Sequence, residues 1–445
     1  MIQEADDRGP TLSPAPQLVR AIGRWSMVAL AVNSIVGSGV FGLPSVIAGL
    51  VGPWSPLAVL LAGAAMAVII ACYAEVASQF TETGGHYLYV RAAFGRLAGL
   101  EVGWLTLLSR LTACAASVNL LVISLGQFWP GAGAPLPRFA VMSLVVGALA
   151  VANYRGVAAG TLASNVSVVA KLVPLALVCA VGLAYLAVHG AAATQAPGAG
   201  VDGWLRAMLL LFFAYGGYEA ALNPMGEARD PRRDAGFALF VALLVITFLY
   251  TALQLIVAGV LPEAARSERP LADVARIIMG PAGAAFVSLG ALISVYGYLS
   301  ANLLTVPRGV YALAERGDFP AAFAAIHPRF RTPYLSIVTI ALALWAFALL
   351  GSFTWNITLS AVARLFYYAA VCAAVPVLRR RQGGAAAFRL PGGVLLPALG
   401  VLICLVLVTR VDFSKSLILL AVLLAAAANW LLVRRRGTII EGGHP

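Results

Sequence analysis

The chain has 445 residues, of which 61% are hydrophobic and 11% charged, and its mean hydropathy is +0.91. These values exclude a soluble globular protein and indicate a polytopic membrane protein with no room for a sizeable soluble domain. The net charge of +12 does not point to nucleic acid, because the basic residues form short clusters between apolar runs.

Twelve apolar runs follow one another along the chain, each of about the length that a membrane-spanning helix needs. They cover approximately residues 23–48, 55–77, 97–126, 138–157, 162–187, 204–225, 236–261, 282–308, 334–351, 356–378, 391–410 and 414–433. The alternating pattern of a membrane β-barrel does not occur, so an all-α membrane protein is expected. Residues 1–18 are predicted to be a disordered tail, 19–435 a single membrane domain and 436–445 a second tail.

Basic residues set the predicted orientation. With the N-terminus inside, 20 of the 30 lysines and arginines fall in inside segments and 7 in outside segments, and Arg110, Lys171 and Arg364 lie within helices. The positive-inside rule then puts both termini in the cytoplasm. The five cysteines lie within apolar runs and are interpreted as core residues, not as a disulfide framework or a metal site.

The first run is interrupted by Gly37, Ser38, Gly39 and Gly42 within about one and a half turns. In hydrocarbon, a broken helix persists only around a polar cavity or a bound group. A second half-helix starting at Ser38 would direct its positive dipole end at a carboxylate. By itself, the stretch is equally compatible with a small-residue face that packs against another helix.

The sixth run has a similar interruption, in which Gly216 and Gly217 are followed by Glu219. The two interrupted runs are five helices apart. Interrupted helices at matching positions of two halves indicate an inverted repeat with a binding site between them.

Four segments, in this order, resemble the amino acid–polyamine–organocation (APC) transporter superfamily over nearly the whole chain. They are residues 37–41, 84–95, 213–219 with 227–233, and 308–320 with Thr332-Pro333. The resemblance implies a LeuT-like fold of two inverted five-helix repeats, at about residues 20–187 and 204–380. Helices eleven and twelve would follow at about 391–433.

The resemblance also implies an amino-acid substrate bound at the two interruptions. Its carboxylate would accept hydrogen bonds from the backbone N–H groups of Ser38 and Gly39, and charge-assisted bonds of this kind are strong. Gly37 and Gly39 lack a Cβ and would let the ligand approach the backbone closely. Gly39→Val is therefore expected to abolish binding without impairing folding.

The substrate ammonium would be held by the carbonyl groups of Ile35, Phe213 and Gly216. Phe213 and Tyr215 are predicted either to wall and gate a side-chain pocket or to be core residues. Gly216 and Gly217 are expected to leave volume in that pocket. Glu219 is the only acidic residue near this stretch. A cationic substrate would need an unpaired carboxylate in the pocket, so a neutral, fairly apolar amino acid is the expected substrate.

A charge at the membrane centre costs about 2.5–3.5 kcal/mol, so Lys171 is a functional candidate. In some relatives without sodium dependence, a lysine in helix five takes the place of a coupling sodium ion. Lys171 would then either exchange a proton or tie helix five to carbonyls of helix one.

Glu219 would either sense protons or accept local hydrogen bonds. Arg364 is expected to pair with carboxylates or carbonyls in the interior. For Arg110 the same pairing is expected, or a contact with an acidic substrate group.

Other charged residues are assigned to loops. Arg91, Arg308 and residues 227–233 are expected either to form ion pairs that close an inner gate or to be solvated, and His86 and His327 to be exposed.

The expected function is secondary active transport of an amino acid by alternating access, independent of sodium and coupled to protons. Exchange or uniport without proton coupling, and a non-transporting sensor, are the alternatives. An enzyme is not expected, since no metal-ligand cluster, Ser/His/Asp set or phosphate-binding loop occurs, and no cofactor is assigned. The Ala- and Arg-rich, Lys-poor composition favours a bacterial inner membrane. The identity of the amino acid and the oligomeric state stay open.

Overall fold

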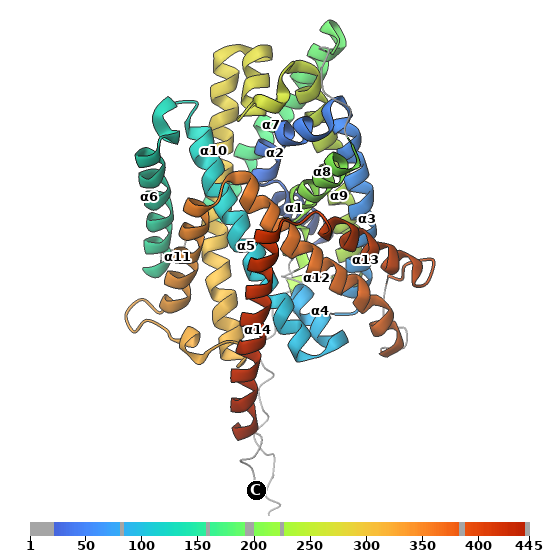
Figure 1. The fold of residues 1–445 in the computed structure, drawn as a ribbon, viewed down its shortest axis with the longest axis vertical. Helices are drawn as coiled ribbons and strands as arrows, with labels where there is room; N and C mark the ends of the chain where they lie inside the picture. Colours follow the sequence, from blue (N-terminus) through green and yellow to red (C-terminus); the bar gives the residue numbers. More distant parts are fainter. Residues whose placement is uncertain are drawn as a thin grey trace, which may run out of the picture.

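The computed structural model describes residues 22–80, 84–156, 161–191, 200–222, 227–381 and 388–440, so the expected tail 1–18 and residues 441–445 lie outside it. The α-helices are α1 (Arg24–Ile35), α2 (Ser38–Val51), α3 (Ser55–Ala77), α4 (Gly85–Phe94), α5 (Arg96–Leu125), α6 (Pro135–Tyr154), α7 (Thr161–His189), α8 (Val201–Tyr215), α9 (Pro231–Val260), α10 (Pro270–Glu315), α11 (Tyr334–Leu350), α12 (Phe353–Arg381), α13 (Leu395–Val408) and α14 (Phe413–Ile440) (Figure 1). The 3₁₀-helices are η1 (Gly52–Trp54), η2 (Pro130–Gly133), η3 (Tyr218–Leu222), η5 (Ala264–Arg266) and η6 (Ala321–Ala324).

Helices follow the apolar runs of the sequence closely. The helix predicted at 55–77 is α3, and the run 97–126 corresponds to α5. The segment 84–95, assigned to a loop, instead contains the helix α4, whose ten residues are too few to span a membrane. Helix α10 bends at Gly280, where φ is 74°, and the run 282–308 forms its longer part.

Within the described ranges, nine helical stretches are long and apolar enough to cross a membrane, and α2, η1 and α3 count together as one of them. Helices α11 and α13 are apolar but shorter. The chain is therefore an all-helical membrane protein. The number of twelve spans and the two inverted repeats stay predictions.

Both predicted interruptions are confirmed. Helix α1 ends at Ile35, Val36 and Gly37 form a bend, and α2 begins at Ser38. Helix α8 ends at Tyr215, and the chain turns through Gly216 and Gly217 before η3. The turn needs a glycine because φ is 111° at Gly217, in a region that side chains disfavour.

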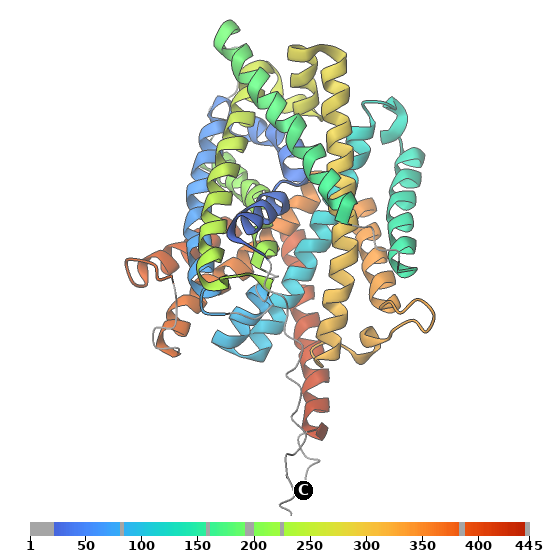
Figure 2. The ribbon, with the colours of Figure 1, turned by 180° about the vertical axis from the view of Figure 1, so that it is seen from behind.

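The two interruptions lie together in the middle of the bundle. Helix α2 packs against α8, and α1 packs against η3 (Figure 1). Helix α7 lies against α9 and α10 and crosses the bundle obliquely in the view from behind (Figure 2). Helices α6 and α11 lie side by side at one edge of the molecule, and α13 lies at the opposite edge (Figure 1).

Candidate functional site

Lys171 of α7 reaches the interruption between α1 and α2. Its ammonium donates hydrogen bonds to the carbonyl oxygens of Asn33, at 2.5 Å, and Val36, at 2.8 Å, and the residue is buried. These carbonyls lie where the helix unwinds, so a regular helix would not offer them to a side chain. The buried charge is thus held by backbone dipoles that the interruption exposes.

The start of α2 presents unpaired backbone donors. In the described part of the chain, the N–H groups of Ser38 and Gly39 have no hydrogen-bond acceptor. A Cβ added at Gly37 would have open space around it, with only the Ile35 carbonyl oxygen 3.9 Å away. The local geometry therefore leaves an approach to the first N–H groups of this half-helix.

Gly39 lies in a different environment. A Cβ added there would lie 3.2 Å from Cα of Ala214 in α8. A valine at this position would strain the packing of α2 on α8, so the expectation that Gly39→Val leaves folding intact is not supported by the geometry.

The two interruptions also touch through their backbones. A Cβ added at Gly217 would lie 2.5 Å from the carbonyl oxygen of Ser34. The carbonyl oxygen of Ile35, one of the predicted ammonium ligands, accepts a hydrogen bond from the Tyr250 hydroxyl at 3.2 Å. Only glycine at position 217 allows this close approach.

Glu219 and Arg364 form a buried ion pair beside the second interruption. Arg364 Nη1 lies 3.6 Å from Glu219 Oε1, and the two side chains are 7% and 8% exposed. Glu219 also accepts hydrogen bonds from the Gly217 backbone N–H, at 2.9 Å, and from the Tyr367 hydroxyl, at 3.2 Å. The pairing of Arg364 with a carboxylate matches the sequence-based expectation.

Arg364 takes the space that the sequence was expected to leave for a ligand. A Cβ added at Gly216 would lie 1.5 Å from Arg364 Nη1, and the guanidinium lies 5.5 Å from the ring centroid of Phe213. The expectation that Gly216 and Gly217 leave pocket volume is therefore wrong in this structure. The sequence indicated a charge inside the apolar run that forms α12, but not its position against the end of α8.

Tyr215, the second predicted pocket residue, faces α3. Its hydroxyl donates to the carbonyl oxygen of Val59 at 2.9 Å, and its ring packs near Tyr250. These contacts favour the packing alternative for Tyr215, and its role as a gate stays a prediction.

His86 is buried, contrary to the expectation of an exposed loop histidine. Its ring stacks on Tyr367, with centroids 4.7 Å apart, and Nε2 lies 2.7 Å from the Thr106 hydroxyl oxygen. Because that hydroxyl donates to the Val102 carbonyl, Nε2 carries the proton and donates to Thr106. Burial lowers the pKa of His86 to about 4 despite the opposing effect of the Glu219 carboxylate, so the ring is neutral at pH 7.

Arg110 is half-buried in α5 and has no hydrogen bond or ion pair with the described residues. The expectation that it pairs with a carboxylate or carbonyl therefore finds no support there.

The arginines near α4 converge on an acid that the sequence had not singled out. Arg91 and Arg96 form ion pairs with the buried carboxylate of Asp318, at 3.4 and 2.7 Å, and the Tyr87 hydroxyl donates to it at 2.5 Å. Arg91 thus pairs with the segment after α10 and not with residues 227–233. Burial and the bond to Asp318 raise the pKa of Tyr87 to about 12.

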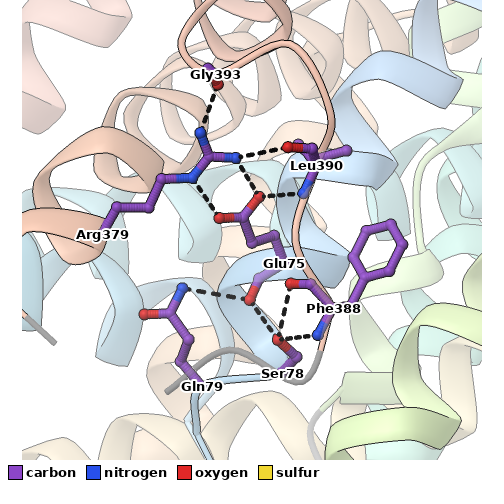
Figure 3. Close-up of polar contacts among 7 residues, drawn as sticks. All are labelled: Glu75, Ser78, Gln79, Arg379, Phe388, Leu390 and Gly393. Carbon is purple, nitrogen blue, oxygen red and sulfur yellow. Dashed lines mark hydrogen bonds and ion pairs between the residues drawn. The ribbon is translucent and has the colours of Figure 1, made fainter. Parts of the chain in front are cut away.

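A second buried ion pair joins α3 to α12 (Figure 3). Arg379 binds both carboxylate oxygens of Glu75, each at 2.6 Å, and Glu75 is completely buried. The Leu390 backbone N–H donates to Glu75 at 2.8 Å, and Arg379 donates to the Gly393 carbonyl at 2.5 Å. The pair therefore ties Leu390 and Gly393, which precede α13, to α3 and α12. An acid inside the apolar run 55–77 was the sequence signal for it.

Two broken helices that meet at the centre of a helical membrane protein are typical of transporters, which bind their substrate within the bilayer. Residues 22–428 match the family model described as "Amino acid permease". The chain is 27% identical to the branched-chain amino acid permease of Bacillus subtilis (strain 168), covering 94% of each chain. It is also 27% identical to the serine/threonine exchanger of the same organism, over 86% of this chain and 89% of the exchanger. An uncharacterized transporter of Mycobacterium tuberculosis (strain ATCC 25618 / H37Rv) is 29% identical, over 96% and 97%.

The chain therefore belongs to the amino acid permease family of the APC superfamily. It is an integral membrane transporter of amino acids.

Proposed function

We propose that the protein carries a neutral amino acid across a bacterial inner membrane by alternating access, independent of sodium and coupled to protons. Both termini are cytoplasmic in this proposal, as the distribution of basic residues favours. The observation that carries it is the pair of hydrogen bonds from Lys171 to Asn33 and Val36. The Lys171 ammonium already occupies these carbonyl oxygens, so they are not available to coordinate a sodium ion.

The substrate carboxylate is assigned to the unpaired N–H groups of Ser38 and Gly39, at the N-terminus of α2. Support comes from the open space at Gly37 and from the affinity of helix N-termini for anions. The ammonium is assigned to the carbonyls of Ile35, Phe213 and Gly216. That of Ile35 has a second lone pair available beside the bond from Tyr250.

Proton coupling is assigned to Lys171 and Glu219, a buried lysine and a buried acid at the two interruptions. Each would exchange a proton as the bundle moves, since a change of hydration changes the energy of a buried charge.

Uptake into proteoliposomes tests the proposal. Replacing external sodium by choline should leave uptake of a neutral amino acid unchanged, and an inward proton gradient should accelerate it. Acceleration by sodium alone would contradict the assignment of Lys171.

Obligatory exchange is the second candidate, because the serine/threonine relative is named an exchanger. Uptake that requires counter-substrate inside the vesicles and ignores the proton gradient would favour exchange.

A further inference from the structure

A side chain of the protein supplies a positive charge at the interruption between α8 and η3. Arg364 extends from α12 into the space at Gly216, beside the ring of Phe213, and donates from Nε to the Ser109 hydroxyl at 3.2 Å. The guanidinium thus lies among the residues assigned to the wall of the substrate pocket.

Glu219 is the acid beside this wall, and its carboxylate is fully engaged. One oxygen accepts the Gly217 N–H, and the other accepts the Tyr367 hydroxyl and faces Arg364. A ligand cation would have to displace Arg364 to reach Glu219.

Burying an ion pair is costly and seldom stabilises a protein more than apolar residues of the same volume would. Such a pair is therefore a candidate for a role in specificity. A cationic substrate side chain packed against this wall would be repelled by Arg364 and would find no unpaired carboxylate. A neutral side chain would contact an ion pair that has no net charge. Juxtaposed like charges are an effective way to reject a wrong partner.

We propose that Arg364 is a specificity-determining residue: as the tethered counter-ion of Glu219, it restricts the site to amino acids with neutral side chains. This inference rests on the proposed function, because it presumes that the interruption between α8 and η3 contacts the substrate. Nη1 of Arg364 is the atom that faces Glu219 Oε1, at 3.6 Å, so the positive charge of the pair lies on the side of Glu219.

The test uses the purified full-length protein and a panel of L-leucine, L-serine, L-lysine, L-arginine and L-glutamate. Binding is measured by thermal shift and by competition with uptake of a labelled neutral amino acid. The wild type should bind at least one neutral amino acid and prefer it to lysine and arginine by about tenfold or more.

Arg364→Gln frees the Glu219 carboxylate, and affinity for lysine or arginine should rise by about tenfold or more. The double variant Glu219→Gln/Arg364→Gln has no free charge and should not gain this affinity. Glu219→Gln alone leaves the arginine unpaired and should gain affinity for glutamate. Arg308→Gln, which removes an exposed arginine of α10, should keep the wild-type selectivity.

The outcomes distinguish a failure of the proposed function from a failure of the role assigned to Arg364. A wild type that binds none of the amino acids contradicts the proposed function. A wild type that binds lysine or arginine as well as its neutral substrate overturns the role of Arg364, whether or not the variants fold. Folded Arg364→Gln that still binds neutral substrate without gaining cationic ones overturns it too. Should Arg364→Gln not fold, the response of Glu219→Gln to glutamate decides.

Discussion

The ammonium of Lys171 donates to the carbonyl oxygen of Val36 at 2.8 Å and so joins α7 to the bend between α1 and α2. One side chain thereby compensates the broken backbone next to the half-helix whose N–H groups are proposed to bind the substrate carboxylate. The contact explains why a lone lysine is tolerated in an apolar helix, since a buried charge must find dipoles or a counter-ion.

Lys171→Ala removes this contact and leaves the carbonyls of Asn33 and Val36 without their charged partner. We expect uptake into proteoliposomes to fall by about tenfold or more and the free energy of unfolding to fall by about 1.5–3 kcal/mol. Lys415→Ala is the matched control, because Lys415 is the only other lysine and pairs with Asp412 at the start of α14. Wild-type uptake and an unchanged response to a proton gradient in Lys171→Ala would contradict the assignment.

Gly37→Ala and Gly39→Ala separate close approach of the ligand from helix packing. The added methyl at Gly37 points into open space, so folding should change by less than about 1 kcal/mol while substrate affinity falls. At Gly39 the methyl presses on Ala214, and this overpacking, which costs about 1–3 kcal/mol, should outweigh the gain in helix propensity of about 1 kcal/mol. Melting temperatures and ligand-induced shifts measure both effects. Equal substrate affinity in Gly37→Ala and the wild type would speak against a carboxylate at this helix end.

Glu75→Gln should be strongly destabilising. It leaves the guanidinium of Arg379 buried with an incomplete partner and loosens residues 388–393, at a cost of about 3–5 kcal/mol. Glu263→Gln, which breaks the exposed pair with Arg266, should cost at most about 1 kcal/mol. Thermal unfolding in detergent compares them, and a similar loss in both variants would show that burial of the first pair does not matter.

The free energy of unfolding should depend on pH in acidic solution, because His86 titrates differently in the folded and unfolded chain. In the folded state the pKa of His86 is about 4, below its ordinary value of 6.5, so between these pH values the unfolded chain binds a proton that the folded chain does not. The stabilisation of the folded state from this pKa difference is complete above pH 6.5. It is lost as the pH falls through 4, and the free energy of unfolding decreases by about 3 kcal/mol in all.

His86→Gln should flatten this part of the curve of melting temperature against pH. His189→Gln, an exposed histidine at the end of α7, should not change the curve. An unaltered slope between pH 4 and 6.5 in His86→Gln would rule out His86 as its source.

Much of the helical frame could be predicted from hydropathy and glycine spacing, as α3 and the two interruptions illustrate. Helix α4 could not, because a ten-residue helix carries too few apolar residues to stand out from a loop. His86 was misassigned for the same reason: burial depends on what packs against α4, namely Tyr367 of α12 and Thr106 of α5.

At the candidate site, the sequence supplied the residue types but not their partners. It indicated that Lys171 and Glu219 lie within apolar runs, and it left open whether they bind protons or neighbours. Arg364 could be placed within a helix, yet its occupation of the Gly216 space depends on how α12 packs against α8.

The sequence by itself determined that this chain crosses a membrane as helices and that two of those helices are broken, because hydropathy and glycine spacing act locally along the chain. Only the tertiary structure decided which charges meet. Glu219 with Arg364, Glu75 with Arg379 and Asp318 with Arg96 are far apart in sequence, and a side chain in a low-dielectric interior must find its partner wherever the packing of helices brings one within reach.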